Sequence, residues 1–272
     1  MEGRGLRWLL RGISAAVLAF LYVPLAVVVL NAFNKDQVVS WPPSLATTSW
    51  FTTAWHNPAL REPVINSFVV GIIATVIALV LGSLASFAMA RATFFGRDAI
   101  SFALVLPIAF PGIVTALALS SMVDAMPWLD FGIPAIIVGH ATFCVVVVFN
   151  NVVARLRRSS GSIVEASMDL GADGLTTFRY VTFPAIRTAV LAGALLAFGL
   201  SFDEIIVTIY LSGTTSTLPI WIYNNITRPF DQPEVFAVAT VVLLISVVPV
   251  YIAVKLAGEG ALRPASQARI TN

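Results

Sequence analysis

The sequence predicts an all-α integral membrane protein with six transmembrane helices and both termini in the cytoplasm. Composition is the first observation: 58% of the 272 residues are hydrophobic and only 11% are charged, with a mean hydropathy of +0.90. A soluble domain has roughly 45–50% apolar and about 25% charged residues, so the composition excludes one. The other two observations are a set of long apolar stretches and a one-sided distribution of Lys and Arg.

Six apolar stretches are long enough to cross a bilayer, whose core of about 30 Å requires about 20 helical residues. They run near 9 to 31, 64 to 90, 100 to 123, 133 to 153, 187 to 210 and 235 to 257. The first stretch follows Arg4, Arg7 and Arg11 and exceeds the 7–15 apolar residues of a signal peptide, so we expect it to be retained as the first span.

The orientation follows from the basic residues between the spans. Thirteen of the 16 Lys and Arg fall on one side, and Lys35, Arg61 and Arg228 fall on the other. Because Lys and Arg accumulate in cytoplasmic loops, both termini and the loop 154–186 are predicted to be cytoplasmic. The opposite side carries most tryptophans, as expected of residues that anchor a helix at the interface: Trp41, Trp50, Trp55, Trp128 and Trp221.

Small residues recur every four positions in the second and fifth spans, which favours close packing of helices. The two stripes are Ala74, Ala78, Gly82, Ser86 and Ala90, and Ala185, Ala189, Gly193, Ala197 and Ser201. Their functional interpretation is that such helices can slide or rotate with little steric penalty. The third span contains Pro107 and Pro111, which predict a kink. That kink is either a shaped helix in a bundle or a bend beside a water-accessible pathway.

Asp203 and Glu204 are adjacent carboxylates inside the predicted fifth span, near its outer end. A charge at mid-membrane costs about 2.5–3.5 kcal/mol on insertion scales and usually faces a partner charge or a water-filled cavity. The pair therefore either pairs or snorkels at the interface, or attracts a cationic substrate. His140, in the fourth span, is interpreted first as a hydrogen-bond partner between helices.

Several kinds of chemistry are absent from the sequence. It has no GxxxxGK[ST] loop, GxSxG elbow or HExxH pair, so we expect no catalytic residues, and no cofactor bound by this chain. Cys144 is the single cysteine, and His56 and His140 lie far apart with no ligands at metal-binding spacing, so no metal site is expected. If the protein performs energised work, another subunit must supply the energy.

The stretch from Ser162 to Pro184 is charged and helix-patterned, unlike its apolar surroundings. Ser162 and Glu165 have the spacing of a capping box, and Gly171 stands where a helix would end. We therefore expect a short, exposed cytoplasmic helix that another protein contacts.

This stretch resembles the EAA loop of permeases in binding-protein-dependent ABC importers, whose pattern is EAA, three residues, G, nine residues, I, any residue, LP. Here the frame reads Glu165-Ala166-Ser167, then Gly171, then Val181-Thr182-Phe183-Pro184, with Ser167, Val181 and Phe183 as conservative departures. The resemblance implies a type I importer permease of MetI-like fold in the bacterial inner membrane. It implies an N-terminal region 1–62, a permease core 63–257 that contains the coupling loop 154–186, and a cytoplasmic tail 258–272.

The implied partners are a second permease, two cytoplasmic ATPases that bind ATP and Mg, and an external solute-binding protein. The implied ATPase-coupling positions are Glu165, Ala166, Ser167, Asp169, Leu170, Gly171 and Pro184. Three segments, 140–143, 201–204 and 217–223, resemble the second permease of spermidine/putrescine-type systems. Candidate residues along the substrate pathway are Asp203, Glu204, His140, Phe202 and Tyr223. The expected solute is thus a polyamine or related small amine.

Other interpretations remain open at this point. Related permeases carry other solutes, such as an amino acid derivative like GABA, ferric iron, sulfate, phosphonate or thiamine. A channel or secondary transporter would show inverted repeats or broken helices, and no repeat between the two halves is visible. An intramembrane enzyme would need a nucleophile with a base, for which only His140 and Ser201 are conceivable.

Overall fold

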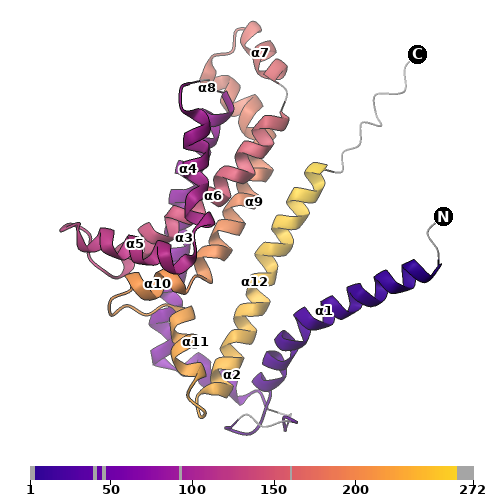
Figure 1. Cartoon of the computed structure of the whole chain (residues 1–272), viewed down its shortest axis with the longest axis vertical. Helices are drawn as coiled ribbons and strands as arrows, with labels where there is room; N and C mark the ends of the chain where they lie inside the picture. Colours follow the sequence, from indigo (N-terminus) through magenta and orange to yellow (C-terminus); the bar gives the residue numbers. More distant parts are fainter. Residues whose placement is uncertain (1–3, 39–41, 45–46, 92–93, 160, 262–272) are drawn as a thin grey trace. The chain divides into compact units, whose positions relative to one another are not determined.

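The computed structural model describes residues 4–38, 42–44, 47–91, 94–159 and 161–261. Trp41, Arg263, Arg269 and most of the predicted tail 258–272 lie outside these residues. Every element within the described ranges is helical (Figure 1). The helices are α1 (Arg4–Ala32), α2 (Ser49–His56), α3 (Pro58–Arg91), α4 (Arg97–Ala109), α5 (Gly112–Asp124), α6 (Ile133–Arg158), α7 (Gly161–Asp169), α8 (Gly174–Thr177), a π-helix (Phe178–Thr182), α9 (Phe183–Phe202), α10 (Ile206–Leu211), α11 (Leu218–Ile226) and α12 (Gln232–Ala261).

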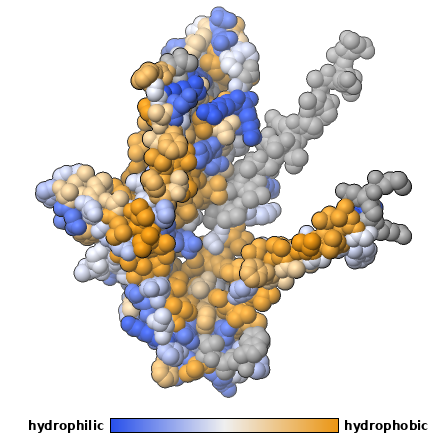
Figure 2. All heavy atoms as spheres, in the orientation of Figure 1, coloured by the Kyte–Doolittle hydropathy of each residue, from blue (hydrophilic) through white to orange (hydrophobic). Residues whose placement is uncertain are grey.

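The all-helical membrane fold is confirmed. Among the described residues, four helices are long and apolar enough to cross a membrane, or five if α4 and α5 together form one span, and Gln232–Val248 is a shorter apolar helix. The predicted spans 9–31, 64–90 and 133–153 lie within α1, α3 and α6. In Figure 2 hydrophobic residues cover most of the visible surface of α1 and α4, and a patch of hydrophilic residues lies at the end of the second unit that carries α7 and α8.

Two predicted spans are not continuous helices. The span 100–123 divides into α4 and α5, which meet at a bend of 105°. The bend falls at Phe110 and Pro111, where extended backbone ends α4 and Pro111 caps α5. The prediction that the fifth span continues to residue 210 is wrong, because α9 ends at Phe202 and the chain re-enters a helix only at Ile206.

The chain divides into two compact units. The first contains residues 1–61 and 221–245. Within it the side chain of Asn57 donates a hydrogen bond of 2.7 Å to Glu234, and the indole of Trp50 donates to the carbonyl of Asn34 at 2.7 Å. None of the most apolar window of α1 is buried in the structure, so this helix presents its full circumference to its surroundings.

The second unit contains residues 62–220 and 246–272, and its core is built around α6. Both predicted small-residue stripes pack against this helix. A methyl group added at Gly82 of α3 would lie 2.9 Å from the carbonyl oxygen of Val145 and 2.9 Å from Cβ of Val148. One added at Gly193 of α9 would lie 3.3 Å from Cα of Val148. Val148 thus lies between two glycines of neighbouring helices.

Gly82→Ala tests this packing. The added methyl group would meet backbone on α6, which cannot move aside, so we expect a loss of about 1–3 kcal/mol in the free energy of unfolding. Thermal unfolding of the solubilised protein measures it. Gly199→Ala in α9 is the matched control, because a methyl group there has no atom within 4 Å. Equal melting temperatures for the two variants would contradict the packing account.

Candidate functional site

The acidic pair of the predicted fifth span lies in a break between two helices, at residues 203–205. The sequence predicted that both carboxylates lie within one continuous span. Instead Asp203 ends α9, with its backbone N–H donating to the carbonyl of Gly199 at 3.2 Å. Ile205 then stands at the N-cap of α10, whose first residue is Ile206. The two carboxylates are therefore oriented by irregular backbone rather than by helix periodicity.

Glu204 stabilises the start of α10. Its side-chain oxygen accepts a hydrogen bond from the backbone N–H of Val207 at 3.0 Å. Its backbone carbonyl accepts from the hydroxyl of Thr208 at 2.7 Å. These contacts satisfy an N–H group that a helix start leaves free, and a carboxylate there also interacts favourably with the helix dipole. Glu204 thus has a local structural partner.

Asp203 differs from its neighbour. Its side chain is exposed, and its carboxylate makes no hydrogen bond or ion pair with any described residue. The adjacent Phe202 packs edge-on against Phe68 of α3, with ring centroids 5.1 Å apart, and contacts Phe198 at 5.6 Å. The Phe202 ring therefore packs the end of α9 against α3.

His140 lies on α6 and is 1% exposed. Its Nδ1 is 2.8 Å from the hydroxyl of Ser201 in α9, and its Nε2 is 2.8 Å from the hydroxyl of Thr208 in α10. Both ring nitrogens therefore engage neighbouring helices, in agreement with the interpretation of His140 as a partner between helices. The structure thus places His140 with Glu204 around the break. Tyr223 lies on α11 in the first unit and is 57% exposed.

The stretch that resembles the EAA loop forms α7, α8, the π-helix and the start of α9, at one end of the second unit (Figure 1). Gly171 ends α7 as expected, with a positive φ of 86°. Its N–H donates to the carbonyl of Met168 at 2.8 Å, and the N–H of Ala172 donates to that of Ser167 at 3.1 Å. This pair of bonds is a Schellman motif, which needs a left-handed residue and so favours glycine.

The start of α7 differs from the predicted capping box. The helix α7 begins at Gly161, so Ser162 lies inside its first turn instead of preceding it. The chain has a capping residue that we did not predict, Asp173, whose side chain accepts a 2.7 Å hydrogen bond from the N–H of Thr176 at the start of α8. Hydrogen bonding with the Thr176 side chain and backbone lowers the pKa of Asp173. In the sequence, the signal that could have indicated this cap is an Asp one residue before a short polar run.

The exposed surface of this stretch is partly apolar. Leu170 is 89% exposed and Leu175 is 76% exposed, on either side of the Gly171 turn. The remaining predicted coupling positions are exposed or half-buried, Pro184 in the first turn of α9 and the others on α7 and the turn that follows it: Glu165, Ala166, Ser167, Asp169 and Gly171. The buried hydroxyl of Thr177 lies 3.1 Å from that of Ser167 and links α8 to α7. The turn therefore presents two large apolar side chains at the surface of the described segment.

Two arginines join this stretch to the spans. Arg91, at the end of α3, donates a 2.9 Å hydrogen bond to the hydroxyl of Thr182 in the π-helix. Arg155 of α6 donates to the carbonyl of Ala185 at 2.9 Å. A π-helix leaves the ordinary backbone ladder irregular; Arg91 holds the end of this one, and Arg155 holds the start of α9 that follows it. Nothing in the spacing of residues indicated these contacts.

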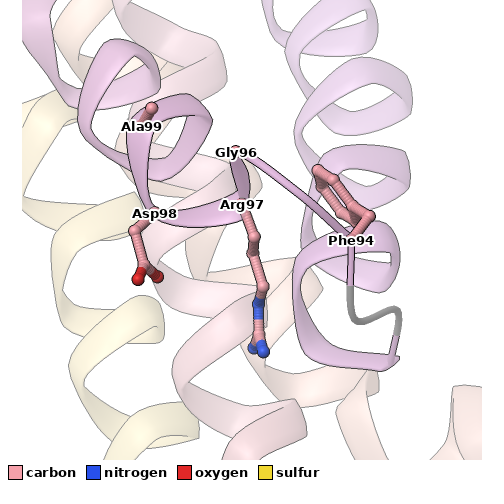
Figure 3. A pocket seen from close by; sticks show the side chains of 5 residues that line it. All are labelled: Phe94, Gly96, Arg97, Asp98 and Ala99. Carbon is pink, nitrogen blue, oxygen red and sulfur yellow. The ribbon is translucent and has the colours of Figure 1, made fainter.

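A pocket of about 330 Å³ opens at the start of α4 (Figure 3). It is lined by Phe94, Gly96, Arg97, Asp98 and Ala99, and so belongs to one turn of the chain rather than to the helix break. Among the described residues, no group of three or more His, Cys, Asp or Glu side chains is arranged to hold a metal ion.

Helices long and apolar enough to cross a membrane, a break at residues 203–205 and an exposed turn at Gly171 describe a multi-pass membrane protein, and comparison with known proteins specifies its class. Residues 78–259 match the family described as binding-protein-dependent transport system inner membrane component. The chain belongs to this family. It is a multi-pass inner-membrane permease of a binding-protein-dependent importer, a transport component rather than a catalytic subunit.

Two relatives are similar to this protein over most of its length. It is 32% identical to the putrescine transport system permease protein PotI of Escherichia coli (strain K12), over 82% of each chain. It is 31% identical to the spermidine/putrescine transport system permease protein PotC of the same strain, over 92% of this chain and 93% of that one. The fold is similar to that of a bacterial alginate importer, with a TM-score of 0.66, 17% identity and coverage of 95% and 98%.

Proposed function

We propose that this permease passes a polyamine, such as putrescine or spermidine, or a related small amine into the cytoplasm. Relatives at 30–32% identity over most of the chain carry putrescine or spermidine/putrescine in their names. The structural observation that supports the same solute class is the unpartnered carboxylate of Asp203 in the helix break. A carboxylate at membrane depth is costly unless it meets a cation, and an organic ammonium supplies one.

The proposal assigns the two carboxylates different roles. Glu204 is engaged by the N–H of Val207, so its charge is already stabilised within the chain. Asp203 has no such partner and is the group that a passing ammonium would contact. Phe202 and the neighbouring Phe68 place an aromatic surface next to it, and aromatic faces attract cations. Tyr223 is retained as a candidate of the pathway on the resemblance alone.

The energy would come from two ATPase subunits on the cytoplasmic face, which bind ATP and Mg. The sequence contains no phosphate-binding loop of its own. The exposed turn around Leu170, Gly171 and Leu175 is the surface that such a partner would bind. A second permease of a different sequence and an external solute-binding protein would complete the transporter.

Asp203→Asn tests the solute contact. Removing the charge while keeping the shape should lower polyamine uptake by the assembled transporter about tenfold, the scale of one charged hydrogen bond. Uptake of a radiolabelled diamine into cells or proteoliposomes measures it. The matched control is Glu204→Gln, whose side-chain oxygen can still accept from Val207, so its loss should be much smaller. Full uptake by the Asp203→Asn variant would remove Asp203 from the pathway.

Gly171→Ala tests the coupling surface. A left-handed backbone at φ 86° costs a residue with Cβ about 1–2 kcal/mol, so the Schellman turn should be distorted. We expect solute transported per ATP hydrolysed to fall in proteoliposomes, or the ATPase to dissociate. Gly174→Ala adds the same methyl group three residues later, in α8 and equally without neighbours within 4 Å, and should leave the ratio unchanged. Identical behaviour of the two variants would contradict the assignment.

A further inference from the structure

A buried chain of polar side chains crosses the break between α9 and α10. His140 of α6 contacts Ser201 in the last turn of α9 and Thr208 in the first turn of α10, each at 2.8 Å. The exposed fractions of Ser201, His140 and Thr208 are 3%, 1% and 0%. All three belong to the second unit, in which α10 also packs against α5 and α6 (Figure 1).

The hydrogen bonds in this chain have a definite direction. The hydroxyl of Thr208 has one proton and donates it to the carbonyl of Glu204 at 2.7 Å. It can therefore only accept at its contact with His140, so Nε2 carries the ring proton. In the neutral imidazole Nδ1 is then the acceptor, and Ser201 donates to it. The order of donation is Ser201 to His140 to Thr208 to the backbone of Glu204.

This order joins the two sides of the break through one ring. Residues 203–205 lie between the two hydroxyls, so the ring fixes the distance between the end of α9 and the start of α10. The neighbouring Gly139 allows α6 to approach α10 closely, because a methyl group at this position would lie 3.0 Å from Cγ1 of Val207. Buried polar groups are costly when one partner is lost, so a fully satisfied chain of this kind specifies one conformation.

We propose that His140 is a positioning residue for transport, holding the break between α9 and α10 so that Asp203 projects toward the solute. This inference rests on the proposed function for the identity of the solute, but the geometry of the break does not. His140 acts through Ser201 and Thr208 and does not itself touch the solute, because both its ring nitrogens are occupied.

The mechanical part is tested without any solute. Cys144 is the single cysteine and is buried, and Val207 in the first turn of α10 is only 3% exposed, so a thiol introduced by Val207→Cys reports opening of the break through its labelling with a maleimide in the assembled transporter. Thr208→Val keeps the shape of the side chain and removes the hydroxyl. We expect it to increase the labelling rate at position 207 about tenfold, because a buried ring N–H and the Glu204 carbonyl both lose their partner. Thr208→Ser retains the hydroxyl and should label within about twofold of the parent, as expected for a retained hydrogen bond.

Ser201→Ala removes the hydrogen bond at the other end of the series, between Ser201 and His140. It is the alternative test variant if Thr208→Val does not assemble, as judged by recovery of the intact complex. It should also increase the labelling rate, since Nδ1 of His140 loses its donor. An unchanged labelling rate in an assembled Thr208→Val or Ser201→Ala variant would overturn the inference. The parent protein without the introduced thiol controls for labelling of Cys144.

The transport part is tested by a double-mutant cycle between positions 208 and 203, with uptake of putrescine as the readout. Thr208→Val should reduce putrescine uptake about tenfold, Thr208→Ser should restore it, and Thr208→Val combined with Asp203→Asn should be no worse than Asp203→Asn alone. Additive losses would contradict action through Asp203. If Asp203→Asn leaves uptake unchanged while labelling still responds to Thr208→Val, the solute role of Asp203 fails and the positioning of the break stands.

Discussion

Close packing of α3 and α9 against the central helix α6 is the constraint on which the second unit depends. Val148 of α6 lies between Gly82 and Gly193, so backbone meets backbone on both sides with no long side chain between them. Near one end α6 carries His140, which contacts both sides of the helix break, and near the other it carries Arg155, which holds the start of α9. One rigid helix therefore contacts both regions that the proposed mechanism must connect.

The broken fifth span explains how two adjacent carboxylates acquire different chemistry. In a continuous helix both side chains would lie on the surface of the same cylinder. Ending α9 at Phe202 instead allows Glu204 to accept the N–H of Val207 and leaves Asp203 without a partner among the described residues. The break exposes backbone groups that lipid cannot satisfy, and the hydroxyl of Thr208 satisfies the carbonyl of Glu204. The same contacts thus stabilise the break and separate the two acids.

Composition, apolar length and residue spacing predicted the features that follow from local rules. The helices, the two small-residue stripes and the left-handed turn at Gly171 belong to this group. The break at 203–205 was missed because the apolar run continues to Leu211 and hydropathy does not register a change in backbone. Pro111 indicated a kink but not a bend of 105°. The partners of His140 and the contact of Arg91 with Thr182 join residues 61 to 91 positions apart, which spacing along the chain cannot indicate.

The central claim is that this permease carries a cationic amine. Transport by the complete assembly, reconstituted with its ATPases, its second permease and its binding protein, tests it most directly. ATP is supplied on the side of the vesicle that the ATPase subunits face. The account then predicts accumulation of labelled putrescine or spermidine and no accumulation of sulfate or a phosphonate. Accumulation of an oxyanion, with no movement of either amine, would contradict it.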